Sequence, residues 1–166
     1  REVQPGEIGE LLFSGPAVVP GYEHHALPDH DGWYCSGDLA RQDEDGFYHF
    51  IERKSGMIKV AGLKVYPLQV EQVLQQHPSI QEAAIIGIKE KRRGCVPLAF
   101  VVLEEGYPFT QDDLTQFCTQ RLAPYMIPKQ FCQLDSLPKI GSGKTNKKAL
   151  SSLNNDEKTS NYNVII

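Results

Sequence analysis

The stretch "EAAIIGIKEKRRGCVPLAFVVLE", residues 82–104, decides the fold of this chain. Residues 82–89 and residues 97–104 are two continuous apolar runs of strand length. Runs of this kind predict strands rather than loops. Which kind of sheet they join follows from the elements predicted on either side of them.

A helix is predicted on each side of these two strands. Before them, residues 67–77 carry an apolar stripe at helical spacing, which Pro67 opens and Pro78 ends. After them, Thr110 is a suitable N-cap for a helix over residues 111–122, with acidic residues in its first turn. The side chains expected to face the core from this second helix are Leu114, Phe117, Cys118 and Leu122.

The remaining elements after Arg53 complete the pattern. They are a short hairpin within residues 53–65, a strand at residues 129–134 and a last helix at residues 146–153. The order is therefore strand, strand, helix, strand, strand, helix, strand, helix, without regular βαβ units. This order predicts an α+β fold in which helices pack on a small sheet.

The first third of the chain is β-rich. Residues 7–14 are a strand candidate, and residues 34–53 indicate strand, turn and strand around Asp45-Gly46, a strong hairpin signal. Between them, residues 21–33 are rich in Gly, Pro, His and Asp and are expected to form a loop. We expect three parts: residues 1–53, residues 54–153, and a polar disordered tail at residues 154–166.

Composition bounds the class of protein. The chain has 166 residues, 40% of them hydrophobic, and a net charge of −4, which gives no general attraction to nucleic acid. No apolar run approaches the roughly 18 residues of a membrane span, and the start at Arg1, without Met or an apolar leader, suggests a piece of a longer protein. We expect a cytoplasmic location, free or peripheral to a membrane. The cysteines form no C-x-x-C pair, so we expect reduced thiols and no metal site; they are Cys35, Cys95, Cys118 and Cys132.

The stretch "LPKIGSGKTNKKAL", residues 137–150, contains Gly-Ser-Gly-Lys-Thr, which suggests a phosphate-binding P-loop. That loop needs a glycine five places before Gly143, where this chain has Pro138, and only 21 residues (166 − 145) follow the motif. Instead, Gly141 and Gly143 predict a mobile loop that presents Lys144, whose compact charge could be carried to a phosphate. A disordered basic tail is the plainer alternative.

Two further polar clusters precede this loop. Asp38 follows Gly37 at a predicted strand start; a carboxylate can accept two hydroxyl hydrogen bonds from a sugar diol, although turn chemistry alone also explains it. The second cluster lies in "ERKSGMIKVAGLKV", residues 52–65, and a solvated basic hairpin is its plainer interpretation. Its glycines allow close approach of a ligand and large torsional changes. It comprises Arg53, Lys54, Lys59 and Lys64 with Ser55, Gly56 and Gly62.

Taken together and in this order, the motifs resemble the C-terminal part of the adenylate-forming acyl-CoA synthetases, a superfamily that also contains luciferases and the adenylation domains of peptide synthetases. The resemblance reaches to about Leu153. The segments that carry it are "GEIGELLFSGPAVVPGY" (6–22), "GWYCSGDLARQDEDGFYHFIER" (32–53), "MIKVAGLKVYPLQVEQVL" (57–74) and "LPKIGSGKTNKKAL" (137–150).

The resemblance implies roles for three residues in adenylate formation. Lys144 would be the adenylation lysine, which contacts both the substrate carboxylate and the α-phosphate of ATP. Asp38 would hold the ribose hydroxyls, and Arg53 would support the same sugar.

The resemblance also implies a moving second domain. Ser55 and Gly56 would form the hinge. Lys59, Gly62 and Lys64 would line the pantetheine channel when the thioester forms.

Domain roles, substrates and cofactors follow in the same way. Residues 1–53 would end a large N-terminal AMP-binding domain, and residues 54–153 would form the mobile C-terminal domain. The implied reaction uses ATP, Mg²⁺ held mainly by the N-terminal part outside this chain, and coenzyme A, with a carboxylic acid that is fatty or aryl. The chain alone is expected to be inactive.

The sequence departs from the family pattern in places. Ser55-Gly56 replaces the usual [DK]-[DE], and Gln69 replaces a usual Glu, although Glu71 remains. Thr145 replaces the usual aliphatic residue, and Asn146 and Lys147 occupy a stretch where a hydrophobic-x-[RK] pattern is common. Within the superfamily, "LKVYPLQVEQVL" (63–74) with Pro67 resembles the acyl-CoA ligases, especially fatty-acyl types, more than the peptide-synthetase adenylation domains. This resemblance favours coenzyme A as the acceptor. Two alternatives remain open: an adenylation enzyme that loads a carrier-protein thiol, and a non-catalytic relative that binds a nucleotide or a partner.

Overall fold

The computed structural model describes residues 2–16, 18, 21–22, 25–26, 29–30 and 32–155. The chain divides into two compact units, Arg1–Met57 and Ile58–Ile166. The strands of the first unit are β1 (Ile8–Phe13), β2 (Gly21–Tyr22), β3 (His25–Ala26), β4 (Asp29–His30), β5 (Trp33–Gln42) and β6 (Tyr48–Arg53), followed by the 3-10 turn η1 (Lys54–Gly56). The second unit contains β7 (Ile58–Val60), β8 (Leu63–Val65), α1 (Pro67–Leu74), β9 (Ile80–Glu90), β10 (Gly94–Leu103), α2 (Gln111–Thr119), β11 (Gln130–Gln133) and α3 (Lys147–Asn155).

The first unit is built around the long strand β5. Strands β1, β4 and β6 all pair with it in antiparallel fashion, and β2 and β3 form a separate two-stranded sheet. The predicted hairpin is confirmed: Asp43 Oδ1 accepts hydrogen bonds from the N–H groups of Asp45 and Phe47, and Gly46 has a φ of 88°. The loop predicted at residues 21–33 is wrong where that segment is described, because β2, β3 and β4 lie there. Backbone pairing with a partner strand outweighs the turn-rich composition of this segment.

The second unit follows the predicted order of elements. Its main sheet has the order β11-β10-β9, and the β7–β8 hairpin forms a second, two-stranded sheet. Strands β9 and β10 are antiparallel, whereas β10 and β11 are parallel and joined through α2. The expectation of no regular βαβ unit is therefore wrong for this one connection, since parallel pairing needs a crossover that α2 supplies.

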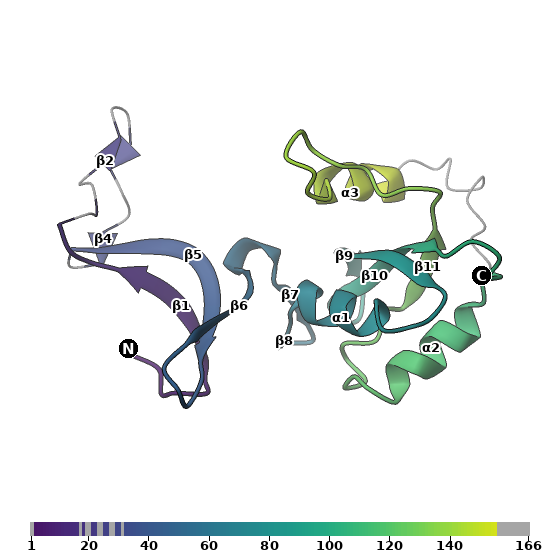
Figure 1. Cartoon of the computed structure of the whole chain (residues 1–166), viewed down its shortest axis with the longest axis horizontal. Helices are drawn as coiled ribbons and strands as arrows, with labels where there is room; N and C mark the ends of the chain where they lie inside the picture. Colours follow the sequence, from purple (N-terminus) through teal and green to yellow (C-terminus); the bar gives the residue numbers. More distant parts are fainter. Residues whose placement is uncertain are drawn as a thin grey trace. The chain divides into compact units, whose positions relative to one another are not determined.

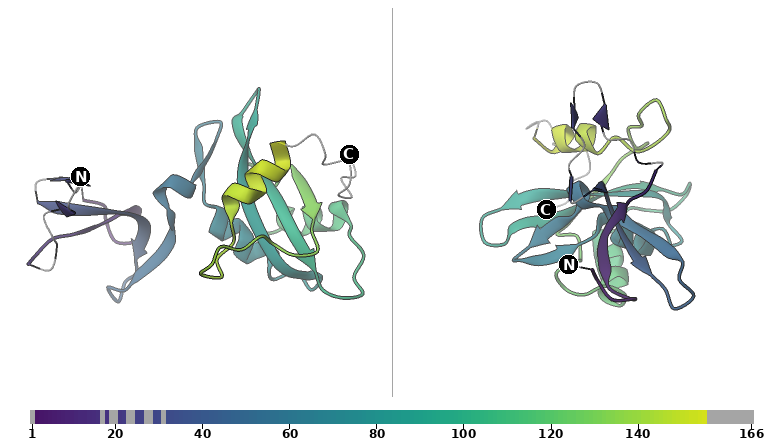
Figure 2. Two further views of the ribbon diagram at one scale, coloured as in Figure 1. Left: turned by 90° about the horizontal axis from the view of Figure 1, so that it is seen from above. Right: turned by 90° about the vertical axis from the view of Figure 1, so that its left-hand side faces the viewer.

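Both faces of the β9–β10–β11 sheet are buried, which explains the continuous apolar runs in its sequence. Figure 1 shows α1 and α2 on one face and α3 on the other, and Figure 2 shows α3 running across the strands. Residues alternate between the two cores: Ala83 and Ile85 face the cluster shared with α1 and α2, and Ala84 and Ile86 face the cluster that contains Leu150 of α3.

Helix α2 differs in detail from its prediction. Thr110 occupies the N-cap position with extended backbone, but its side chain makes no capping hydrogen bond. The helix ends at Thr119 rather than at Leu122, although Leu122 is buried with Leu114 and Cys118 as expected. Phe117 is only half-buried and lies outside the apolar clusters, because its ring packs against polar neighbours instead.

The α+β fold class is confirmed by this arrangement. The predicted tail at residues 154–166 lies outside the described residues from 156 onward, and its first two residues belong to α3. In the part of the chain that the structure describes, no helix has the length and apolar character that a membrane span requires.

Candidate functional site

Asp38 and Arg53 form an ion pair in the first unit. They lie directly opposite each other on β5 and β6, so both side chains leave the same face of the sheet. Arg53 Nε is 2.8 Å from Asp38 Oδ1, and Arg53 Nη1 donates to the carbonyl of Ser36 at 3.0 Å. The structure thus brings together the two residues predicted to bind the ribose.

Oδ1 of the Asp38 carboxylate is buried and faces Arg53, whereas a quarter of the side chain as a whole is exposed. Although Oδ1 lies close to Arg53 Nε, it accepts no well-aligned hydrogen bond among the described residues. The orientation comes from a bulge: the pairing of β1 with β5 shifts register between Glu10 and Leu12, and Gly37 adopts a φ of 73°. Bulges of this kind redirect side chains beside functional sites. The exposed part of this carboxylate could accept hydrogen bonds from a ligand that brings hydroxyl groups.

The connection after β6 is a single 3-10 turn. Ser55 is exposed and Gly56 is half-buried, and the flanking residues Arg53 and Met57 have extended backbones. A Cβ on Gly56 would lie 3.1 Å from Oε1 of Glu52, so a larger residue there would push that buried side chain. Glycine at position 56 therefore allows the turn to pack closely against the Glu52 side chain.

Lys54 extends from this turn to the sheet. Its Nζ donates to the Glu10 carboxylate, and this hydrogen bond raises the pKa of Lys54. The ammonium of Lys54 is therefore engaged within the first unit.

The β7–β8 hairpin places the predicted channel residues close together. Lys59 and Lys64 are direct cross-strand partners, and both are exposed. Ala61 and Gly62 form the two-residue turn with φ values of 48° and 87°, the combination of a type I′ hairpin. The Ala61 N–H donates to the carbonyl of Arg93 at 2.9 Å, which fixes the turn against the β9–β10 connection. Like charges opposite each other disfavour a sheet pair, so an anion bound there would relieve a cost.

Lys144 lies at the end of a tight hairpin turn rather than on an irregular loop. The Gly143 N–H donates to the Ile140 carbonyl at 2.8 Å, and the Ile140 N–H donates to the Lys144 carbonyl at 2.8 Å. Gly143 has a φ of 81°, as expected for a three-residue hairpin loop whose last residue is left-handed. Residues Lys139 and Thr145 pair on either side of it. Lys144 itself is exposed, and it belongs to the second unit.

The departures from the family pattern have local explanations. Gln69 is exposed on α1, so its replacement of a Glu removes no buried contact, whereas Glu71 is buried. Asn146 caps α3, since its Oδ1 accepts from the Ala149 N–H at 3.1 Å. Thr145 takes part in the strand bridge with Lys139.

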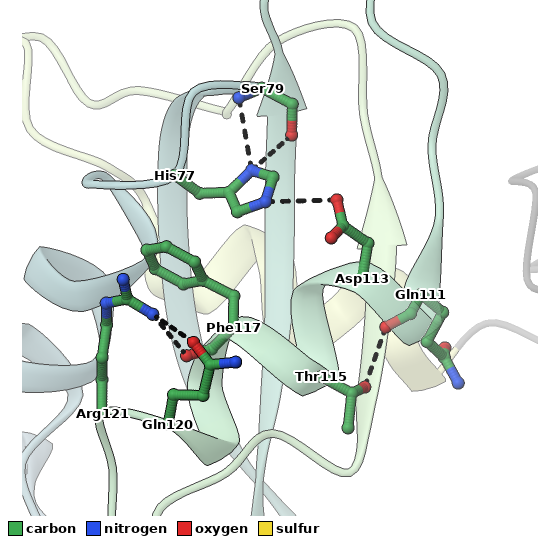
Figure 3. Close-up of polar contacts among 8 residues, drawn as sticks. All are labelled: His77, Ser79, Gln111, Asp113, Thr115, Phe117, Gln120 and Arg121. Atoms are coloured by element: carbon green, nitrogen blue, oxygen red, sulfur yellow. Dashed lines mark hydrogen bonds and ion pairs between the residues drawn. The ribbon is translucent and has the colours of Figure 1, made fainter.

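A Ser–His–Asp arrangement in the second unit was not predicted from the sequence. Figure 3 shows His77 between Ser79 and Asp113: the Nδ1 to Ser79 Oγ distance is 2.7 Å and the Nε2 to Asp113 Oδ2 distance is 3.2 Å. The Ser79 N–H also points to Nδ1, which assigns Nδ1 as acceptor and Nε2–H as donor. The rings of Phe117 and His77 pack edge to face, with 4.8 Å between their centroids. The guanidinium carbon of Arg121 lies 3.7 Å from the centroid of the Phe117 ring.

The position of Ser79 argues against catalysis by this arrangement. Ser79 and His77 are each only 6% exposed, so a substrate could not reach the hydroxyl. The cluster instead ties the loop before β9 to α2.

The four cysteines are free thiols, and two of them are buried in the second unit. Burial raises the pKa of Cys118 to about 11 and also raises the pKa of Cys132. At pH 8 only about a thousandth of the Cys118 side chains would be thiolate, the reactive form. We expect iodoacetamide to modify the half-buried Cys35 and Cys95 first, and the buried pair only after denaturation. Peptide mass spectrometry over a time course measures this order, and early alkylation of Cys118 would contradict it.

In the described ranges, no group of three or more His, Cys, Asp or Glu side chains could hold a metal ion.

Comparison with known proteins finds one matching family model and several similar curated proteins. Residues 69–144 match the AMP-binding enzyme C-terminal domain. The chain is 39% identical to a 2-succinylbenzoate–CoA ligase of Listeria monocytogenes over 90% of its length and 32% of the relative's, and 37% identical to a long-chain-fatty-acid–CoA ligase of Bacillus subtilis over 96% and 29%. It thus spans about a third of the length of the curated relatives it matches.

The chain is also similar to a solved structure. The o-succinylbenzoate CoA synthetase from Bacillus subtilis, in complex with its acyl-adenylate intermediate, superposes with a TM-score of 0.80 at 37% identity, covering 89% of this chain and 31% of that one.

Proposed function

This chain belongs to the adenylate-forming acyl-CoA synthetases, and on that premise we propose that the protein containing it joins a carboxylic acid to coenzyme A at the expense of ATP. The observation that carries the proposal is the Asp38–Arg53 pair, which holds a partly exposed carboxylate in a fixed place on β5. A carboxylate held in this way can accept hydrogen bonds from the two hydroxyl groups of a ribose diol. An exposed lysine at the motif position, Lys144, supports the same assignment.

In the first half-reaction an oxygen of the acid attacks the α-phosphorus of ATP. The bond from that phosphorus to the bridging oxygen breaks, pyrophosphate leaves, and acyl-adenylate remains. Two negative groups must approach each other, so the Lys144 ammonium would lower the barrier by balancing their charge. Asp38 would hold the ribose by accepting its hydroxyl hydrogen bonds, and Arg53 would keep that carboxylate oriented.

In the second half-reaction the thiolate of coenzyme A attacks the acyl carbonyl. The carbon–sulfur bond forms, the bond to the phosphate oxygen breaks, and AMP leaves. We assign Lys59, Gly62 and Lys64 to the channel of the pantetheine arm. Ser55 and Gly56 would be the hinge about which the second unit rotates between the two half-reactions. That rotation would replace the Lys144 hairpin in the active site by the β7–β8 hairpin.

The domain assignment is part of the same proposal. Residues 1–53 would close the large AMP-binding domain, and residues 54–153 would form the mobile one. ATP, Mg²⁺ and coenzyme A are the ligands of the whole protein, with Mg²⁺ held mainly outside this chain.

The acid is fatty or aryl in this proposal. The relatives' names support both, since they include 2-succinylbenzoate–CoA and long-chain-fatty-acid–CoA ligases.

A coupled assay on the full-length protein tests the proposal. We expect ATP-dependent pyrophosphate release that requires an acid, with 2-succinylbenzoate and a long-chain fatty acid as the two test acids. With coenzyme A present, the thioester should form, and a holo carrier protein should not compete for the acyl group. The chain alone should give no turnover.

Three outcomes would contradict it. Preferential loading of the carrier protein would favour a carrier-directed adenylation enzyme. Absence of adenylate with every acid would favour a non-catalytic relative. Turnover by the chain alone would overturn the division of the active site between this chain and the rest of the protein.

A further inference from the structure

The hairpin that presents Lys144 is held to the second unit by two ion pairs, one on each side. Before the turn, Lys139 Nζ lies 2.9 Å from Glu82 Oε2 on β9. After the turn, Lys147 Nζ lies 2.9 Å from Glu71 Oε1 on α1. Both acceptor carboxylates belong to regular elements of the second unit, so each cation ties one end of the hairpin to that unit. The Lys139–Glu82 pair is the weaker tie, because its two side chains are 48% and 34% exposed.

The Lys147–Glu71 pair, on the α3 side, is the more buried and the more extensively hydrogen-bonded of the two. The Glu71 side chain is 11% exposed, and the same Oε1 accepts the Ile85 N–H of β9 at 2.8 Å. This carboxylate therefore links three elements, α1, β9 and the first residue of α3. A charge buried to this extent is stable only when it is paired and hydrogen-bonded, so removing Lys147 would leave Glu71 under-compensated.

The apolar core supports the same two ends. Leu137 precedes the hairpin and Leu150 follows it; both are buried, in one cluster on the α3 face of the sheet. Between them the backbone is closed by the Asn146 N–H, which donates to the Pro138 carbonyl at 2.7 Å. Leu137, Leu150 and this bond fix where the hairpin leaves the core, and the ion pairs fix its direction.

We infer that Glu71 with Lys147, and Glu82 with Lys139, are positioning residues that hold the Lys144 ammonium in its reactive position. The inference rests on the proposed role of Lys144 in adenylate formation. A small displacement of a catalytic group has a large effect on rate, and such groups depend on the supporting shell around them.

The test measures the two half-reactions separately in the full-length protein. Lys147→Met should lower kcat for adenylation about 10-fold with little change in KM for ATP, and Lys147→Met with Lys139→Met about 100-fold. Thioester formation from preformed acyl-adenylate should stay at the wild-type rate, which also shows that the variants fold. Glu71→Gln should resemble Lys147→Met, because it removes the charge from the same ion pair. The amide oxygen of the new side chain can still accept the Ile85 N–H.

Matched variants and an activity-independent readout complete the test. Lys147→Arg should restore adenylation, and Lys148→Met, one residue along the same helix and exposed, should behave as wild type. Hydrogen exchange at the amides of Ile140 and Gly143 should quicken about 10-fold in Lys147→Met.

Each other result decides against the inference. Equal losses in both half-reactions would indicate a general structural role, and unchanged adenylation or unchanged exchange would remove the positioning role. A wild-type protein that forms no adenylate would instead refute the proposed function, and the exchange measurement would still test the hairpin attachment.

Discussion

Replacing Lys144 by alanine is expected to slow adenylate formation by about 10²–10³-fold, equivalent to roughly 3–4 kcal/mol of transition-state stabilisation. The reason is electrostatic: the acid and the α-phosphate are both negative, and no ion pair within the described residues engages Lys144 in place of a substrate. The second half-reaction should continue unchanged from preformed acyl-adenylate, because the ammonium has no part in it.

Pyrophosphate release and single-turnover thioester formation measure the two rates for this variant. Lys148→Ala is the matched control, since it removes a neighbouring exposed cation from the same end of the chain. The assigned role of Lys144 would be wrong if its replacement left adenylation intact, or if it slowed both half-reactions equally.

Replacing Asp38 by asparagine is expected to raise KM for ATP by about 100-fold, or roughly 2.7 kcal/mol. Two charge-assisted hydrogen bonds to ribose hydroxyls would be weakened, each worth about 1.5–3 kcal/mol before relaxation. Folding should change by less than about 1 kcal/mol, because the Arg53 side chain is 62% exposed and an ion pair of that kind contributes little.

Nucleotide titration and thermal unfolding separate these two effects. Asp43→Asn is the matched control: Asp43, in the turn between β5 and β6, also pairs with a basic side chain, His49 of β6, and that hydrogen bond lowers the pKa of Asp43. It should leave KM for ATP unchanged. A large loss of stability in Asp38→Asn with normal nucleotide binding would make the Asp38–Arg53 pair structural.

The order of elements was predictable because it depends on local signals. The apolar runs that became β9 and β10, the prolines around α1 and the glycine turns each act within a few residues. The parallel pairing of β10 with β11 was not predictable, since it depends on residues about thirty positions apart meeting in space. The prediction that Phe117 packs in the apolar core failed for a related reason. Helical spacing predicts which side of α2 the residue lies on, but only the fold shows that His77 and Arg121 contact its ring.

Some residues of the candidate site could likewise be predicted from the sequence, and others could not. Asp38, Arg53 and Lys144 lie in motifs that a sequence displays directly. Glu71 and Lys147 are 76 positions apart (147 − 71), so nothing in the sequence pairs them, although a Glu inside an apolar helical stripe was a signal of a buried partner.

The bulge at Gly37 and the turn at Gly143 were marked only by their glycines. Their consequences, the direction of Asp38 and the ordered hairpin under Lys144, needed the backbone torsions of the structure.

A crystal structure of the full-length protein with a non-reactive acyl-adenylate mimic tests the central claim most directly. The account predicts Lys144 Nζ at hydrogen-bond distance, about 3 Å, from the oxygens that replace the α-phosphate, with the ribose hydroxyls on Asp38. Lys144 out of contact with the mimic in a closed complex, or a ribose bound away from Asp38, would contradict it.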